Sequence, residues 1–287
     1  MSLSSIGIKP NPSTPYHFYT KLAIRIQEDK SMAATQKTVL ITGVTKGIGR
    51  ALALELAKHG HLIIGCGRDK TDLDSLQLQL SNASPQNHLL FVADVKSDDS
   101  IRQMAHTVRD KLGSLDIIVN NAGVSTANLK FWEVPGEMFD NVIDINIKGA
   151  ANVLRHFIPL MLPRNQGIIV NISSLYGRTV GPLASAYCAS KWAIEGLSKS
   201  IAKELPHGMT IVALDPGIIN TDMAVAYFGD LASQYQSPQE WALKAVSMIL
   251  NITTADNGAT LIVPDPGDLL DIPFLLQKRE GEKKDPR

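Results

Sequence analysis

The sequence has little of what marks several large classes of protein. It contains only two cysteines, Cys66 and Cys188, so a disulfide framework is excluded and both are expected to be free thiols of a reducing compartment. No apolar stretch approaches the roughly 18 residues of a membrane-spanning helix. Basic and acidic side chains balance at 28 each, so the formal net charge is zero and no nucleic-acid surface is indicated. No metal site is predicted either.

What the sequence does have is an alternation of strand and helix patterns over most of its length. With 287 residues and 44% apolar composition, the chain is long enough to bury one substantial core. The alternation predicts an α/β fold: a single-domain, Rossmann-type doubly wound parallel sheet with helices on both faces. Ligands of such folds bind at the carboxyl ends of the strands. We place this domain at residues 37–267.

The two ends differ in composition from that domain. Residues 1–36 carry prolines, serines and mixed charges with little periodicity, and are expected to form a flexible arm or a targeting segment. Residues 268–287 form a tail that is first apolar and then charged. The expected location is the cytoplasm, with a plastid or mitochondrion as the alternative if residues 1–36 are a transit peptide.

Three glycines follow the first expected strand. Thr38 to Thr42 (TVLIT) is a short β-branched run, and Gly43, Gly47 and Gly49 come directly after it, before a helical pattern. In this context glycines let the backbone approach a pyrophosphate, whose charge is received by the free N–H groups of the helix N-terminus. The segment is therefore interpreted as a dinucleotide-binding loop, and a glycine-rich turn without a ligand is the alternative.

The end of the second expected strand, His61 to Arg68, indicates which dinucleotide binds. An acid near this strand end would accept hydrogen bonds from the adenosine ribose hydroxyls. The sequence instead has Gly67 followed by Arg68, whose guanidinium suits a 2′-phosphate, and Lys46 adds a second positive charge. This pattern favours NADP(H). Asp69 is the alternative, because NAD would fit if that carboxylate were the ribose ligand.

Two further strands deliver polar and small residues to the same edge. Leu90 to Ala93 leads into Asp94-Val95, where the aspartate could accept from an adenine amine or cap the helix that starts near Asp98. Leu115 to Val119 leads into Asn121, Ala122 and Gly123, which suit close packing against a nucleoside or an ordinary turn.

The run YCASK holds the residues that can do chemistry. If the segment from Ala184 onward is helical, Tyr187 and Lys191 share one face, and Ser174 lies thirteen residues before the tyrosine. A phenol titrates near pKa ~10. A neighbouring cation lowers that pKa toward neutrality, where acid–base catalysis is most efficient. An isolated tyrosine packing over a lysine stem is the ordinary alternative, and the other motifs argue against it.

Together these segments resemble the short-chain dehydrogenase/reductase family over roughly residues 38–265. The motifs that carry the resemblance occur in the family's order and at compatible spacing. They are TGVTKGIG, NNAG, DINIKG, NISS, YCASK and PGIINT.

The resemblance implies a role for each matching position. Tyr187 would be the catalytic acid–base that gives a proton to a carbonyl oxygen. Lys191 would lower its pKa and bind the nicotinamide ribose. Ser174, rather than Ser173, would hydrogen-bond the substrate oxygen, and Asn146 would hold a water that links Lys191 to solvent. The cofactor-binding residues expected from the loop, the strand ends and the resemblance are Gly43, Thr45, Lys46, Gly47, Ile48, Gly49, Arg68, Asp94, Val95, Asn121, Ala122, Gly123, Tyr187, Lys191, Pro216, Gly217, Ile219 and Thr221.

The substrate region lies after Thr221, where the resemblance places a movable lid. Tyr227-Phe228 could cover a planar substrate, Tyr176 and Phe131-Trp132 are further aromatic candidates, and all of them are equally open to core packing. Arg178 is the candidate for an anionic substrate group, although its placement does not require one.

The expected activity is NADPH-dependent reduction of an aldehyde or ketone to the alcohol. The lid and ADNGATLIV resemble plant reductases of pterin aldehydes, which implies a pterin or other planar aldehyde as substrate. The alternatives are an NADP-dependent alcohol or steroid dehydrogenase and a non-catalytic NADPH-binding sensor. Relatives of this length usually form homodimers or homotetramers.

Overall fold

The computed structural model describes residues 36–126 and 128–263. The expected arm at 1–36, except for its last residue, and the tail at 268–287 lie outside the described residues. The strands are β1 (Thr38–Thr42), β2 (Leu62–Gly67), β3 (Leu89–Val92), β4 (Ile117–Asn120), β5 (Gly167–Ile172), β6 (Met209–Asp215) and β7 (Thr260–Ile262). The longer helices are α2 (Gly47–Lys58), α3 (Lys70–Ala83), α4 (Asp98–Leu112), α5 (Gly136–Ile143), α6 (Ala150–Met161), α7 (Ser185–Ile201), α8 (Asp222–Phe228) and α9 (Pro238–Leu250).

Shorter turns connect these elements. A π-helical turn, η3 (Asp144–Gly149), joins α5 to α6. The 3₁₀ turns are η2 (Phe131–Glu133), η4 (Leu162–Arg164), η5 (Leu175–Gly177), η6 (Gly229–Gln234) and η7 (Thr254–Asp256).

The described strands form one parallel sheet in the order β3-β2-β1-β4-β5-β6-β7. The order reverses between β1 and β4, because the chain first builds outward from β1 through β2 to β3 and then returns to the other side of β1. A doubly wound sheet binds its ligand at this reversal, beyond the carboxyl ends of the strands. The predicted fold class is confirmed.

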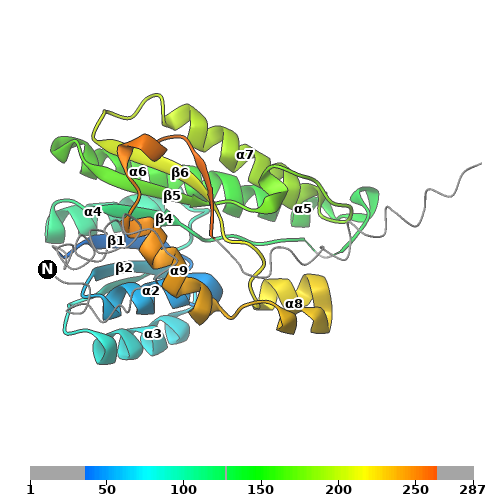
Figure 1. Ribbon diagram of the computed structural model, residues 1–287, viewed down its shortest axis with the longest axis horizontal. Coiled ribbons are helices and arrows are strands. Elements are labelled where there is room, and N and C mark those ends of the chain that lie inside the picture. The colour runs from blue at the N-terminus through cyan, green and yellow to red at the C-terminus, as the bar shows by residue number, and fades with distance from the viewer. Residues whose placement is uncertain (1–35, 127, 264–287) are drawn as a thin grey trace, which may run out of the picture. The chain divides into compact units, whose positions relative to one another are not determined.

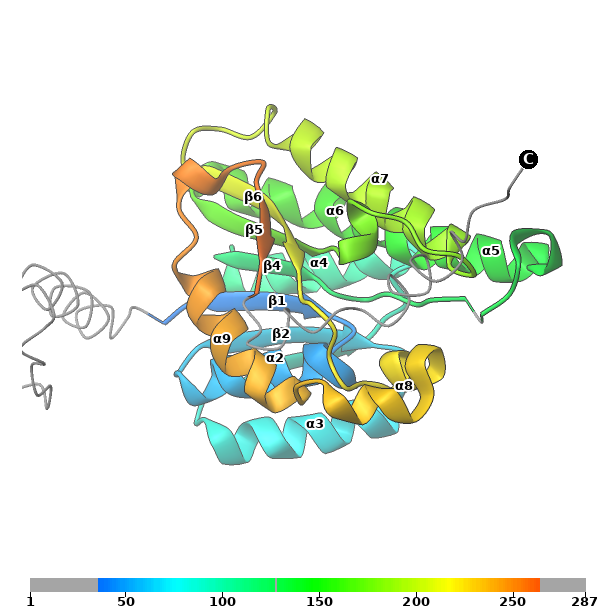
Figure 2. The same ribbon diagram turned by 45° about the vertical axis from the view of Figure 1, so that its right-hand side comes forward.

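Helices cover both faces of the sheet (Figures 1 and 2). On one face Val39 and Ile41 of β1 pack with α2, α3 and α9, and the buried Trp241 of α9 belongs to this cluster. On the other face Leu40 packs with α4 and α6, including Phe157. Adjacent residues of one strand thus enter opposite cores, as the two-residue period of a strand requires. Because both faces are buried, the strands read as continuous apolar runs in the sequence.

The strand ends lie close to those expected from the sequence. The bounds of β1 are those predicted, β2 is shorter by one residue at each end, and β3 begins and ends one residue earlier. The prediction for β4 was wrong at its start, which is Ile117 rather than Leu115. Asp116 lies just before this start, where its Oδ2 accepts a hydrogen bond from the Thr38 N–H at 2.8 Å and its Oδ1 pairs with Arg164.

Candidate active site

A cavity of about 500 Å³ lies beyond the carboxyl ends of the strands. Nearly every predicted site residue lines it, from the glycine loop, the ends of β2, β3 and β4, the start of α7 and the segment after β6. Two predicted residues lie behind the lining: Gly49 in the first turn of α2 and Asn146 in η3.

The glycine loop is held tightly against the end of β4. Gly43 has φ +67°, a conformation that L side chains rarely adopt, and a Cβ on Gly49 would lie 2.3 Å from the Gly43 carbonyl oxygen. Asn121 closes the loop from the other side, because its Nδ2 donates to the carbonyls of Thr42 at 2.8 Å and Gly43 at 3.1 Å. The Asn121 amide therefore positions the loop, and Asn121 and the neighbouring Ala122 both line the cavity.

The end of β2 presents a cation and no acid to the cavity. Arg68 is exposed and lines the cavity, and among the described residues its side chain has no hydrogen-bond or ion-pair partner. Asp69 does not line the cavity. Its carboxylate accepts a hydrogen bond from the Asp72 N–H at 2.9 Å and caps α3, so this carboxylate is engaged within the protein and not with the cavity. Lys46 lines the cavity beside Arg68 but forms a long, exposed ion pair with Asp72 at 3.6 Å, which adds little stability.

The end of β3 resolves one alternative left open by the sequence. Asp94 lines the cavity, and its Oδ1 accepts a hydrogen bond from the Lys96 N–H at 3.0 Å. The helix cap is Ser97, whose Oγ accepts from the Ser100 N–H at 3.2 Å. The capping interpretation of Asp94 was therefore wrong.

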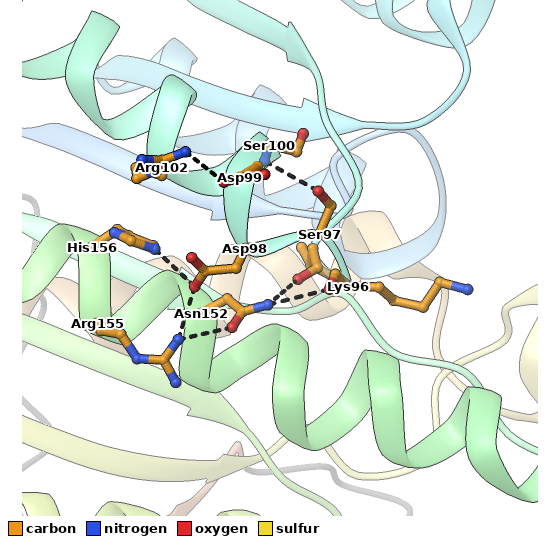
Figure 3. A network of polar contacts seen from close by, with 10 residues as sticks. Lys96, Ser97, Asp98, Asp99, Ser100, Arg102, Asn152, Arg155 and His156 are labelled. Atoms are coloured by element: carbon orange, nitrogen blue, oxygen red, sulfur yellow. Dashed lines mark hydrogen bonds and ion pairs between the residues drawn. The ribbon is translucent and has the colours of Figure 1, made fainter.

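The segment that contains Asp94 is fastened to α6 by a polar network (Figure 3). The buried Asn152 donates from Nδ2 to the Val95 carbonyl at 3.0 Å. Asp98 accepts from Arg155 at 2.8 Å and contacts His156 at 2.9 Å, which holds the first turn of α4 to the same helix. No local sequence pattern predicts these contacts, because their partners lie more than fifty residues apart.

Ser174 and Ser173, adjacent in the chain, have different surroundings. Ser174 follows β5 and lines the cavity, its Oγ accepts a hydrogen bond from the Tyr176 N–H at 3.2 Å, and its side chain acts to lower the pKa of Tyr187. Ser173 also borders the cavity, but it is buried, and its Oγ donates to Glu195 Oε1 at 2.6 Å. Glu195 also accepts from Thr260 Oγ1. The Ser173 hydroxyl is thus committed to the core, and Ser174 is the serine that faces the tyrosine.

Tyr187 and Lys191 share one face of α7, as the four-residue spacing predicts. Lys191 is buried, its Nζ donates to the Ile172 carbonyl at 2.8 Å, and the same atom lies 5.4 Å from the centre of the Tyr187 ring. Burial lowers the pKa of Lys191 to about 8, and the negative charge of Asp215 opposes that change. This lysine is therefore poised to exchange its proton near neutral pH.

The tyrosine differs from the expectation that Lys191 would bring its pKa toward neutrality. Burial raises the pKa of Tyr187 to about 12, and the hydrogen bond from Ser174 acts in the opposite direction without overcoming it. The physical reason is that the Lys191 ammonium points at the Ile172 carbonyl and lies beside the ring. In this state Tyr187 holds its proton across the neutral range and can act as a proton donor.

Asn146 braces the site with its side chain. Its Oδ1 accepts from the Val124 N–H, and its Nδ2 donates to the Val124 carbonyl and to Ser190 Oγ, each at 2.9 Å. A π-helical turn often marks a functional position in a helix, and here it turns this side chain toward α7. The amide links the NNAG strand end to the helix that carries Tyr187.

Aromatic residues form part of the cavity lining. Tyr176, Tyr227 and Phe228 line the cavity. The Tyr176 ring lies edge-on to the Tyr187 ring at 6.4 Å, and its hydroxyl contacts that of Tyr227 at 3.3 Å. The other aromatic candidates, Phe131 and Trp132, were wrong: their side chains are 61% and 78% exposed, and neither lines this cavity.

Arg178 does not face a substrate. Its Nη2 donates to Asp215 Oδ2 at 2.6 Å, and it is absent from the cavity lining. Among the residues that the sequence did not single out are Val124 and Met223, which line the cavity, and Asp215, which lies outside the lining and pairs with Arg178. The signal for Asp215 was its position at a strand end, directly before Pro216-Gly217.

These features fit a dinucleotide in an extended pose across the strand ends. The free N–H groups of the glycine loop suit a pyrophosphate, the unpaired Arg68 suits an adenosine phosphate, and Lys191 suits a ribose hydroxyl. No group of three or more His, Cys, Asp or Glu side chains that could hold a metal occurs in the described part of the chain. None of the helices in that part has the length and apolar character needed to cross a membrane.

Comparison with known proteins agrees with this geometry. Residues 37–231 match the short chain dehydrogenase family. The protein belongs to that family. The resemblance drawn from the motifs is therefore confirmed, and the protein is an oxidoreductase.

Individual short chain dehydrogenases show how similar the chain is. It is 61% identical over 227 residues to an NADPH-dependent pterin aldehyde reductase of Arabidopsis thaliana, covering 79% of this chain and 93% of that protein. The structure of ElxO with NADP bound is 28% identical, with a TM-score of 0.73 and coverage of 83% and 100%. NAD+-bound xylitol dehydrogenase is 25% identical, with a TM-score of 0.71 and coverage of 79% and 97%. The fold thus accommodates either dinucleotide, and the residues at the end of β2 must discriminate between them.

Proposed function

We propose that this short chain dehydrogenase uses NADPH to reduce an aldehyde or ketone, with a pterin or other planar aldehyde as the substrate. The observation that carries the proposal is that one cavity contains both the Ser174–Tyr187–Lys191 group and the unpaired Arg68. The identity to a pterin aldehyde reductase supports the substrate class, as do the aromatic residues Tyr176, Tyr227 and Phe228 that line the cavity.

The residues divide the work of this reduction among them. Ser174 hydrogen-bonds the carbonyl oxygen and stabilises the negative charge that develops there. Tyr187 gives its phenolic proton to the same oxygen, and Lys191 supplies positive charge beside the phenol and binds the ribose. NADPH, when bound, supplies the hydride. Asn146 holds the strand end NNAG and helix α7 in fixed positions relative to each other.

NADPH is preferred over NADH in this proposal because of the charges at the end of β2. A carboxylate there would repel a 2′-phosphate, and Asp69, the acid that directly follows Arg68, is engaged in capping α3. Arg68 and Lys46 present two cations to that end of the cavity. The remaining proposed contacts with the cofactor are Gly43, Thr45, Gly47, Ile48, Asp94, Val95, Ala122, Gly123, Pro216, Gly217, Ile219 and Thr221.

The experiment that tests the proposal follows NADPH oxidation at 340 nm over a panel of aldehydes and ketones that includes pterin and quinoid carbonyls. We expect turnover with NADPH, little with NADH, and the highest kcat/KM for planar aldehydes. A protein that binds NADPH but oxidises none would instead be a sensor. One that turns over only alcohols with NADP+ would be an alcohol or steroid dehydrogenase.

Two further properties are part of the proposal. We expect a homodimer or homotetramer, because the outward face of α7 carries the half-exposed Trp192. We also expect a cytoplasmic location. The plastid and mitochondrial alternatives depend on residues 1–36, almost all of which lie outside the described residues.

A further inference from the structure

Two tyrosine hydroxyls meet in the lining of the cavity. Tyr176 comes from η5, Tyr227 comes from α8, and both line the cavity. Their hydroxyl oxygens lie 3.3 Å apart, and the Tyr227 hydroxyl also donates to the Pro182 carbonyl at 3.4 Å. Both separations are longer than the roughly 2.7–2.8 Å of an ordinary hydroxyl hydrogen bond. The two hydroxyls are therefore loosely held and can take a bound ligand as a partner.

The protons of this hydroxyl pair, Tyr176 with Tyr227, are directed at acceptors within the protein. Each phenol has one proton to donate and two lone pairs that accept. The Tyr227 proton is directed at Pro182, so Tyr176 is the donor to Tyr227. No other residue in the described part of the chain donates to either phenol oxygen. The hydroxyl pair therefore offers acceptors rather than donors to a ligand. Burial raises the pKa of Tyr176, so its hydroxyl stays neutral over the working range of pH.

Tyr176 connects the hydroxyl pair to the catalytic groups. Its N–H donates to Ser174 Oγ at 3.2 Å, and its ring lies edge-on to that of Tyr187 at 6.4 Å. The backbone of Tyr176 is thus beside the catalytic serine, and its hydroxyl lies at Tyr227 of α8. A planar molecule whose carbonyl is bound by Ser174 and Tyr187 would extend along Tyr176, and its far edge would reach the hydroxyl pair.

Gly181 makes room for the Tyr176 hydroxyl. A Cβ at Gly181 would lie 2.6 Å from the hydroxyl oxygen of Tyr176 and 2.8 Å from its Cζ. The φ angle of Gly181 lies outside the left-handed region, so only the lack of space calls for glycine here. An alanine at this position would displace the hydroxyl of Tyr176 without removing it.

The side chains that accompany the hydroxyl pair in the lining are apolar. Val180 precedes Gly181, Met223 lies one helical turn before Tyr227 on α8, and both line the cavity. The ring of Phe228, also in the lining, lies 4.8 Å from that of Tyr227. In a mostly apolar pocket, a few polar groups fix the orientation of the ligand and provide specificity.

We propose that the hydroxyl pair is a specificity site, which selects planar aldehydes that carry N–H donors on the edge remote from the carbonyl. The N–H groups donate to the phenol oxygens while the ring lies among the apolar side chains. This inference rests on the proposed carbonyl reduction and deepens it, because it states which planar aldehydes are preferred. A pair that only held α8 over the cavity would affect every aldehyde alike.

The test compares two planar bicyclic aldehydes that differ in their donors. Formylpterin carries N–H groups on the edge away from its aldehyde, and quinoxaline carbaldehyde carries none. With NADPH and the wild type, kcat/KM should be higher for formylpterin. Tyr176→Phe and Tyr227→Phe should each lower that value for formylpterin by roughly 2- to 12-fold, which corresponds to the loss of one neutral hydrogen bond. Neither variant should change kcat/KM for quinoxaline carbaldehyde.

Two further variants separate the position of the hydroxyl from general packing. Gly181→Ala displaces the Tyr176 hydroxyl, so it should lower the ratio of the two kcat/KM values, but no further when combined with Tyr176→Phe. Tyr235→Phe is the matched control, because Tyr235 packs on Phe228 at 5.7 Å but does not line the cavity. It should leave the ratio unchanged. Equal losses for the two aldehydes in Tyr176→Phe and Tyr227→Phe would overturn the inference.

A binding measurement distinguishes this inference from the proposed function. Pterin has the same N–H edge but no aldehyde, and its own fluorescence reports binding to the protein in the presence of NADP+. Its dissociation constant should rise by roughly 2- to 12-fold in Tyr176→Phe and Tyr227→Phe and stay unchanged in Tyr235→Phe.

The outcomes of the two measurements separate clearly. The expected pattern of pterin binding supports the inference even if no carbonyl is reduced, in which case only the proposed function fails. Dissociation constants that are equal in all variants, or no binding of pterin to the wild type, overturn the inference even if turnover is high. If Tyr227→Phe does not fold, Tyr176→Phe and Gly181→Ala decide the question.

Discussion

At the scale of single residues, the phenol of Tyr187 is the proton donor that the proposed chemistry requires. Tyr187→Phe keeps the ring and its edge-on contact with Tyr176 but removes the proton. General acid catalysis contributes roughly 10²- to 10⁴-fold, so kcat should fall by about that factor. The dissociation constant for NADPH, followed by fluorescence titration, should change little. A variant that keeps wild-type kcat would contradict the proposed role.

Arg68 decides the choice of cofactor at the same scale. Arg68→Ala removes a guanidinium that no other described residue engages. The substitution should therefore break no contact within the protein and weaken only the binding of the adenosine phosphate of NADPH. A hydrogen bond to a charged group contributes about 1.5–3 kcal/mol, which corresponds to a KM for NADPH raised on the order of 10- to 100-fold. The KM for NADH should not rise. Lys70→Ala is the matched control, because that cation lies two positions away and is already paired with Asp74 at 2.9 Å.

At the scale of elements, the attachment of α6 to the end of β3 should control cofactor binding from a distance. Asn152→Ala would leave the buried Val95 carbonyl without its donor, at a cost of about 1–3 kcal/mol in the free energy of unfolding. It should also raise the KM for NADPH, because Val95 and Asp94 line the cavity. Urea unfolding and steady-state kinetics would measure the two effects, and a stability loss with unchanged KM would contradict the coupling.

The exposed contacts of the same network provide the control for Asn152. Asp98→Asn removes the partner of Arg155 and His156, so its effect on stability should be smaller. The hydrogen bond from His156 lowers the pKa of Asp98. The stabilisation is therefore present above the ordinary carboxyl pKa and is lost as pH falls through the lowered value. The variant and the wild type should become equally stable in acid.

Elements also show how far the sequence could predict this site. Strand ends, the glycine loop and the Tyr187–Lys191 spacing follow from local patterns, and the structure gathers their residues around one cavity. The engagement of Asp215 with Arg178, of Glu195 with Ser173, and of Asn152 with Val95 could not be predicted. These are contacts between residues far apart in the chain, and a polar residue type does not specify its partner. Arg178 was misjudged for that reason.

At the scale of the whole molecule, cofactor binding should stabilise the fold, because the cavity draws on loops from nearly every strand end. A ligand at about 100 times its dissociation constant adds about 2.7 kcal/mol to the free energy of unfolding. We therefore expect NADPH to raise the Tm of the wild type, and to raise the Tm of the Tyr187→Phe variant by the same amount. NADH at the same concentration should raise Tm less. Equal shifts with the two cofactors would argue against the discrimination assigned to Arg68.

Self-association is the other property of the whole molecule, and the outward face of α7 offers a specific test. Ala189, Trp192 and Gly196 lie on this face and are exposed, and a Cβ added at Gly196 would have open space around it beyond its own helix. Gly196→Arg therefore fits the single subunit, but it would obstruct a second helix packed against this face. Light scattering coupled to size-exclusion chromatography should show a dimer or tetramer for the wild type and smaller species for this variant. Gly196→Ala is the control: it should leave assembly intact and stabilise α7 by up to about 1 kcal/mol. If Gly196→Arg assembles like the wild type, the subunits associate through another surface.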